Sequence, residues 1–157
     1  MRRKDREVAE LSEIETIIRK CRICHVAMID WEGFPYVVPL HFGYEIENGV
    51  LHLYFHSAPE GKKIKALRKN EQVCFSLIGE EKLILGERPC DYTARYSSVI
   101  GYGTVKFLMD PAEKSRALSL FFQHQTGQNV VFGERETQGV CLFQIVAKEF
   151  CGKHNKD

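Results

Sequence analysis

The 157-residue sequence lacks three features that would each define a class of protein. No run of about 18 apolar residues is present, so no segment is expected to cross a membrane as a helix. No G-x-G-x-x-G pattern occurs, which leaves the sequence without the usual fingerprint of a dinucleotide-binding fold. Basic charge is not in excess either, because 22 Lys and Arg stand against 21 Asp and Glu, so a nucleic-acid partner is not expected.

The N-terminus begins with basic residues, but the apolar run of a secretory signal does not follow, so we expect a cytoplasmic protein. In that compartment the six cysteines should be reduced thiols. The segment from Cys21 to His25 fits the C-x-x-C-H pattern of haem attachment. That attachment follows export, so we interpret the match as coincidence. No second pair with ligand spacing accompanies Cys21 and Cys24, and a metal site is therefore not expected.

The length predicts a single domain over residues 1–157, with a frayed polar tail at 150–157. Hydrophobic periodicity and turn residues predict six strands and three short helices. The helices are expected at 12–20, 57–69 and 110–124, and the strands at 25–29, 36–46, 50–56, 73–78, 97–108 and 140–150. Ser12 has capping-box spacing with Glu15, Asp110 is expected to start the last helix, and Asn48-Gly49 predicts a hairpin turn. Residues 79–96 are expected to form a loop with a short strand at 83–85. Because hairpins dominate and no βαβ alternation is present, the pattern favours a mainly β (α+β) antiparallel barrel.

The segment from His56 to Lys63 joins the end of a strand to the start of a helix. Ser57 and Glu60 have capping-box spacing, and Pro59 suits the first helical turn. The free N–H groups at a helix start suit a phosphate. A phosphate would also relieve the conflict between the lysines and the helix dipole. The alternative interpretation is a capped surface helix with solvated lysines.

Two further segments have patterns that suit a flat ligand. In residues 36–42, Pro39 cannot donate a ladder hydrogen bond, so it marks an edge or a bulge where free backbone groups could meet a ring. In residues 96–103, Gly101 and Gly103 permit another group to approach the strand closely. An ordinary edge strand and an ordinary bulged strand are the alternatives.

In this order and spacing, the stretches PYVVPLHFGYE, LYFHSAPEGKKIKALRKNEQVCFSL and ARYSSVIGYGTV resemble the pyridoxamine 5′-phosphate oxidase-like superfamily of flavin-binding split barrels. They are most similar to its 5-nitroimidazole resistance (Nim-type) branch. The resemblance covers about residues 1–122. It implies a six-stranded antiparallel split β-barrel with short flanking helices, and a homodimer with FMN at its interface.

The resemblance also implies contacts to the flavin ring. Val38, Pro39 and Leu40 would line the isoalloxazine with backbone and apolar groups. Ser98 and Val99 would approach the cofactor from the later strand.

On the phosphate side, the resemblance implies contacts from His56 and Ser57 to the ribityl phosphate, close to Gly61 at the helix start. Lys62 or Lys63 would neutralise the phosphate, and the sequence does not decide between them. His56 is also the one catalytic candidate. FAD remains an alternative cofactor, because it too presents a phosphate to the helix.

The implied activity is flavin-dependent reduction of a small nitro-aromatic substrate. The C-terminal EFCGKHNKD lacks the arginine-rich substrate signature of the dedicated pyridoxamine phosphate oxidases, so their specific activity is not expected. Two other functions stay open. One is a flavin-binding sensor or carrier without turnover, since no acid or base is evident for a particular substrate. The other is a haem-binding split barrel.

Overall fold

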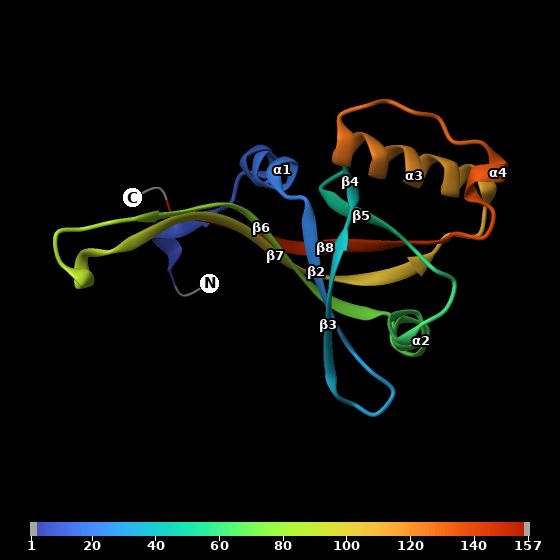
Figure 1. The fold of residues 1–157 in the computed structure, drawn as a ribbon, viewed down its shortest axis with the longest axis horizontal. Coiled ribbons are helices and arrows are strands. Elements are labelled where there is room, and N and C mark those ends of the chain that lie inside the picture. The colour runs from blue at the N-terminus through green and yellow to red at the C-terminus, as the bar shows by residue number, and fades with distance from the viewer. Residues whose placement is uncertain (1–2, 156–157) are drawn as a thin grey trace.

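The computed structural model describes residues 3–155, and most of them build one curved antiparallel sheet, a split β-barrel (Figure 1). Within these residues the sheet has eight strands in the order β3-β2-β6-β7-β8-β5-β4, and β1 pairs with β8. The strands are β1 (Glu7–Val8), β2 (Ile23–Ile29), β3 (Pro35–His41), β4 (Gly43–Glu47), β5 (Val50–Ser57), β6 (Gln72–Ile84), β7 (Thr93–Phe107) and β8 (Cys141–Asn155). The helices are α1 (Leu11–Lys20), α2 (Lys62–Lys69), α3 (Pro111–Thr126) and α4 (Glu134–Thr137), with single 3-10 turns at Lys4–Arg6 and Pro89–Asp91.

The hydrophobic core fills the inner face of the curved sheet. Alternate residues of β2 are buried and partly exposed, as period-two patterning requires. Helix α1 covers one end of the barrel with Ile14, Ile17 and Ile18, while α3 packs on β4 and β5. Burying a large aliphatic or aromatic side chain contributes about 1.5–3 kcal/mol, so this core supplies the main stabilisation. Its largest fully buried aromatic side chains are Phe42, Phe55, Phe75 and Phe143.

The structure confirms two of the predicted turn and cap positions and contradicts a third. The Asn48-Gly49 turn is confirmed, with positive φ at both residues between β4 and β5. The start of α3 is also confirmed, because the Asp110 carboxylate accepts a hydrogen bond from the Glu113 N–H at 2.9 Å. The cap predicted at Ser12 is wrong: α1 begins at Leu11 with Glu10 as its flanking residue, so Ser12 lies inside the first turn.

Several strand boundaries also differ from the expectation. The strand expected over residues 36–46 is two strands, β3 and β4, which separate at the fully buried Phe42 and pair with different neighbours. This break and the short β1 raise the strand count from the expected six to eight within residues 3–155. The frayed tail expected at 150–157 is wrong up to Asn155, because β8 continues there and pairs with β7 and β1. Residues 156 and 157 of that tail lie outside the described residues.

The short strand predicted at 83–85 is confirmed at Leu83 and Ile84, but the loop predicted over the rest of residues 79–96 is largely wrong, because most of this segment forms a two-stranded arm. Strand β6 runs on to Ile84 and β7 starts at Thr93, and the two strands project together from the barrel (Figure 1). A β-bulge between Ile78 and Glu81 shifts the register where the arm leaves the barrel. The charges that suggested a loop are compatible with a ribbon whose two faces both meet solvent. No helix within residues 3–155 is long and apolar enough to cross a bilayer.

Candidate functional site

Several of the predicted site residues meet at one corner of the barrel, where β3 and β5 end and α2 begins. We call this the His56 corner and define it by His41, His56, Lys63 and Phe121. The ring of His56 packs edge-on against that of Phe121, with centroids 4.5 Å apart. Partial burial, then the charge of Lys63 and then His41, lower the pKa of His56. His56 is therefore predominantly neutral at neutral pH, although its side chain reaches the surface.

The position of Phe121 depends on a glycine in β4. A Cβ added at Gly43 would lie 2.3 Å from the Cα of Phe121, so only glycine permits α3 to approach β4 this closely. The start of α3 is fixed by the Asp110 cap, and its body packs on β4 and β5. The fold therefore holds Phe121 against His56 from an element far away in sequence.

The structure separates Lys62 from Lys63, which the sequence could not. The ammonium of Lys62 lies 3.1 Å from the carboxylate of Asp30 and 4.6 Å from the ring centre of Tyr36. Asp30, whose side chain is 2% exposed, also accepts hydrogen bonds from two N–H groups of its own turn. Burial alone would raise the pKa of Asp30, but the Phe34 N–H, Lys62 and the Glu32 N–H together lower it. Lys62 therefore stabilises the turn between β2 and β3 through its ion pair with Asp30.

The side chain of Lys63 lies near His56 and Cys141 instead of Asp30. It is half-buried and has no ion-pair partner within residues 3–155. Burial lowers its pKa, and the nearby Cys141 thiol works in the opposite direction. A partly desolvated ammonium without a carboxylate is an expected feature of an anion site.

The start of α2 differs from the prediction in one respect. Ser57 is the last residue of β5, paired with Cys141, and the helix begins only at Lys62. The predicted capping box of Ser57 and Glu60 is therefore wrong. Gly61 precedes the helix with φ 126°, a conformation that glycine adopts readily, and no side chain caps the first turn. The first N–H groups of α2 are thus left without a side-chain cap.

The predicted ring-binding strand lies at one end of the sheet. Strand β3 pairs with β2 alone among the described strands, which confirms the edge predicted from Pro39. Val38 and Leu40 are partly buried against the core, whereas Pro39 points to the outer face. The backbone of this edge strand is open to a ligand on its free side.

The later pair, Ser98 and Val99, lies away from the His56 corner. Cross-strand pairing connects Leu40 to Cys24, then Leu77, then Val99, so three strand spacings separate Val99 from Leu40, about 14 Å. The Val99 side chain is fully buried in the core. Ser98 lies on the outer face, in a groove of about 620 Å³ with Ile100 and Tyr102. One chain therefore does not bring its two sets of predicted cofactor residues together.

Sequence reasoning identified neither His41 nor Phe121 as a site residue. His41 ends β3 on the same face as Pro39, so the period-two pattern of that strand could have identified it. The Phe121 contact has no local signal, because it depends on the packing of α3.

The two cysteines of the C-x-x-C-H segment are buried. Burial raises the pKa of Cys21 to about 11 and raises that of Cys24 as well, which keeps both thiols protonated. All six cysteines are free thiols. Residues 3–155 contain no cluster of three or more His, Cys, Asp or Glu placed to hold a metal ion.

Fold and corner together define a split β-barrel with a candidate anion and ring site at a sheet edge. A family model described as pyridoxamine 5′-phosphate oxidase matches residues 10–153, and the chain belongs to that family. A candidate 5-nitroimidazole antibiotic resistance protein from Bacteroides thetaiotaomicron is 34% identical, with a TM-score of 0.80 over 94% of this chain and 86% of that one. The predicted family and the likeness to nitroimidazole resistance proteins are both confirmed.

More distant structures share the fold. The FAD and heme binding protein from Mycobacterium smegmatis is 15% identical, with a TM-score of 0.79 over 97% of this chain and 74% of that one. The flavocytochrome from Azotobacter vinelandii is 18% identical, with a TM-score of 0.78 over 100% of this chain and 72% of that one. At these identities the likeness concerns the fold alone. None of the curated proteins searched matches the chain.

Proposed function

We propose that the chain binds flavin mononucleotide at the His56 corner and reduces small nitro-aromatic compounds. One observation carries this proposal: a half-buried lysine without a carboxylate partner lies beside His56 at an uncapped helix start. It does so in a chain that is 34% identical to a candidate 5-nitroimidazole antibiotic resistance protein. FAD is the second cofactor to test.

The residues of the corner fit the two ends of such a cofactor. Lys63 and the free N–H groups at the start of α2 would hold the phosphate, and Ser57 and Gly61 flank that position. The edge of β3 would line the ring through its backbone and Pro39. When bound, the flavin supplies the electrons, while the protein orients and desolvates the reactants.

His56 is the residue placed to handle a proton. Its lowered pKa keeps the imidazole neutral, so one ring nitrogen donates a hydrogen bond and the other accepts one. Reducing a nitro group to an amine takes up six electrons and six protons and releases two waters. Turnover therefore requires an external reductant and a path for protons, and His56 would serve that path.

A homodimer is part of the proposal. The groups at β3, β5 and α2 are distant from Ser98 within one chain, so a second copy would have to supply Ser98 to the same cofactor. The outer face that carries Ser98 also exposes the apolar side chains of Ile78, Ile100 and Tyr102. An exposed apolar sheet face of this kind is typical of an interface.

An absorbance spectrum of the purified protein, before and after FMN is added and the protein re-isolated, tests binding first. We expect retained flavin bands and elution as a dimer on sizing. The flavin-loaded protein, chemically reduced, should then lose its electrons to a nitroimidazole over repeated cycles. If the protein retains no flavin, the proposal is refuted.

The alternatives are distinguished by the same preparation. Retained flavin that no nitroimidazole or quinone re-oxidises would indicate a carrier or sensor. A Soret band after haem addition, together with a failure to retain flavin, would indicate the haem-binding function instead.

A further inference from the structure

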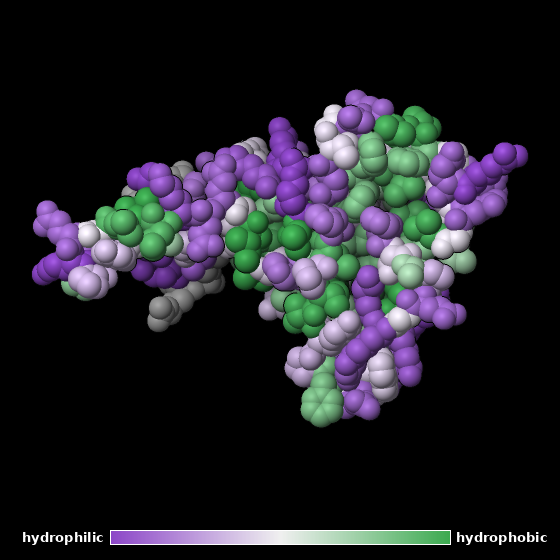
Figure 2. All heavy atoms as spheres, viewed as in Figure 1, coloured by the Kyte–Doolittle hydropathy of each residue, from purple (hydrophilic) through white to green (hydrophobic). Residues whose placement is uncertain are grey.

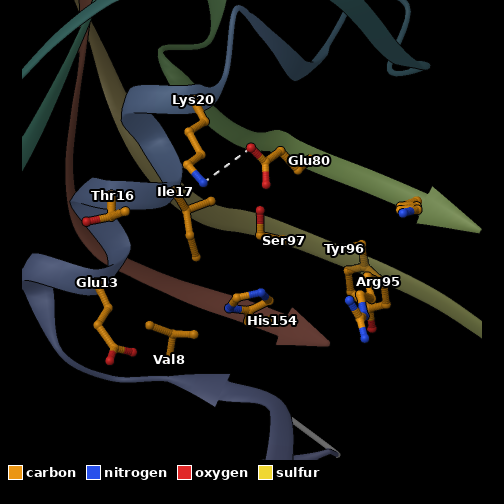
Figure 3. Close-up of a pocket in the computed structure, with 11 residues that line it drawn as sticks. Val8, Glu13, Thr16, Ile17, Lys20, Glu80, Arg95, Tyr96, Ser97 and His154 are labelled. Carbon is orange, nitrogen blue, oxygen red and sulfur yellow. Dashed lines mark ion pairs between the residues drawn. The ribbon is translucent and has the colours of Figure 1, made fainter. Parts of the chain in front are cut away.

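A separate pocket lies between α1, the β6–β7 arm and the end of β8 (Figure 3). We call it the arm pocket and define it by Lys82, Arg95, Ser97 and His154. Its volume is about 550 Å³, which is within the range of small-molecule sites. None of the residues predicted to bind the flavin lines it. Ser97 and Ser98 are neighbours in sequence, but they point to opposite faces of β7.

Ser97 places a buried polar group in this pocket. The residue is 6% exposed and lines the pocket. A Cβ added at Gly79 would lie 2.4 Å from its hydroxyl oxygen, so Gly79 provides the space that this oxygen occupies. The Ser97 hydroxyl is therefore a polar group in the pocket wall that a ligand could meet with a hydrogen bond.

The bases of the pocket come from neighbouring strands. Lys82 and Arg95 are directly opposite each other across the arm, and Ser97 is directly opposite His154. Like charges directly opposite on paired strands repel each other. Neither Lys82 nor Arg95 has an ion-pair partner among the described residues. Arg95 and Ser97 are two residues apart, so they share one face of β7.

The acidic residues that line the arm pocket do not neutralise Lys82 and Arg95. Glu80, within the bulge of β6, has its carboxylate 3.2 Å from the ammonium of Lys20 on α1, and these two charges form an ion pair. Glu13, also on α1, lies at the far end of the view from Arg95 (Figure 3). Ile17 and Val8 contribute apolar surface to the wall of the pocket.

We propose that the arm pocket binds a small organic anion. Arg95 and Lys82 would hold its carboxylate or phosphate group, Ser97 and His154 would donate hydrogen bonds, and Ile17 and Val8 would contact its apolar part. The site does not depend on flavin binding.

Calorimetric titration of the full-length protein with benzoate, its neutral relative benzamide and inorganic phosphate tests this assignment. Saturable benzoate binding is expected, with benzamide weaker by about tenfold or more because it lacks the charge. Competition by inorganic phosphate would indicate that the oxyanion alone is recognised, and no competition that the organic carboxylate is required. Equal affinity for benzoate and benzamide, or no binding of any probe, would overturn the proposal.

Two variants and one control locate the binding. Arg95→Gln and Ser97→Ala should each weaken benzoate binding, whereas Arg88→Gln should not. Arg88 is on the same arm but is paired with Asp91 and lies outside the pocket. Arg95→Gln should also keep or raise the thermal stability of the free protein, because it removes the repulsion from Lys82. If Arg95→Gln and Arg88→Gln change the affinity equally, the site is not at Arg95.

Discussion

The His56 corner and the arm pocket both contain cations without a carboxylate partner, but the fold assembles them in different ways. At the corner, β3, β5, α2 and α3 each contribute one defining residue from a distant part of the chain. In the arm pocket, the defining residues are direct neighbours on paired strands. The corner therefore depends on tertiary packing, whereas the arm pocket depends mainly on strand register.

The two regions also differ in what covers them. At the corner the ring of Phe121 packs against His56, and partial burial lowers the pKa of both His56 and Lys63. The arm instead carries an exposed apolar patch that is separate from the apolar surface of the barrel (Figure 2). The exposed side chains of Leu83 and Leu85 lie on this arm. A charge in the desolvated corner should therefore affect ligand binding more than a charge on the arm does.

The largest expected effect is from Gly43→Ala. Its new methyl group meets the backbone of Phe121, so α3 must shift and Phe121 must move away from His56. We expect a loss of about 1–3 kcal/mol in the free energy of unfolding, measured by urea titration. Flavin retention should fall as well, whereas benzoate binding in the arm pocket should persist.

Gly133→Ala is the matched control for that variant. Gly133 has φ −81°, which suits alanine, and its nearest neighbour is the flexible end of Glu136 at 2.8 Å. Little change in stability is expected. Equal losses in the two variants would show that the contact between β4 and α3 is not the sensitive one.

The second largest expected effect is on FMN affinity, which should differ between Lys63→Met and Lys62→Met. If Lys63 binds the phosphate, its loss should weaken FMN binding by roughly 10- to 100-fold, as expected for a charged hydrogen bond. Lys62→Met should leave the FMN affinity nearly unchanged, because Asp30 already occupies that ammonium. Fluorescence titration of FMN measures both, and a larger loss for Lys62→Met would reverse the assignment.

Lys62→Met should instead reduce stability above acid pH. The folded state lowers the pKa of Asp30, so this carboxylate stabilises the fold above its ordinary range near pH 3.8, and the contribution is lost as the pH falls. Without Lys62 one of the interactions that lower this pKa is absent. Urea midpoints of wild type and variant should therefore differ at neutral pH and converge in acid.

The sequence predicted these two regions unequally for a physical reason. Local signals identified the Asn48-Gly49 turn, the Asp110 cap and the edge position of Pro39, because each depends on one residue and its immediate neighbours. Family resemblance supplied His56 and the lysine pair. The choice between Lys62 and Lys63 depended on Asp30, which is about thirty residues away in the chain, and no local pattern reports that contact.

The arm was missed because its residues fit two interpretations. Charged residues and glycine in 79–96 are typical of loops, but they also suit a ribbon that is solvated on both faces. The β-bulge broke the alternation that would have identified the strand. With the arm read as a loop, the pairing of Lys82 with Arg95 was not predictable, and neither was the arm pocket.

The smallest expected effect concerns acid stability and a second histidine, His124 on α3. The Nε2 of His124 donates a hydrogen bond to the Cys21 carbonyl at 2.7 Å, and its ring packs against Phe42 and Tyr44. Burial is the main cause that lowers its pKa, the Cys21 contact opposes this, and Arg22 adds to it. The unfolded chain thus binds a proton more readily, so stability should decline as the pH falls below about 6.5.

His124→Gln should flatten this decline, because glutamine retains a polar group and does not titrate. The readout is the urea midpoint across the acid range. His56→Gln is the comparison, since the pKa of His56 is also lowered but its side chain reaches solvent, so a smaller flattening is expected. If His56→Gln flattens the profile more than His124→Gln does, the acid sensitivity belongs to the His56 corner, and the FMN retention proposed for that corner should then fall over the same pH range.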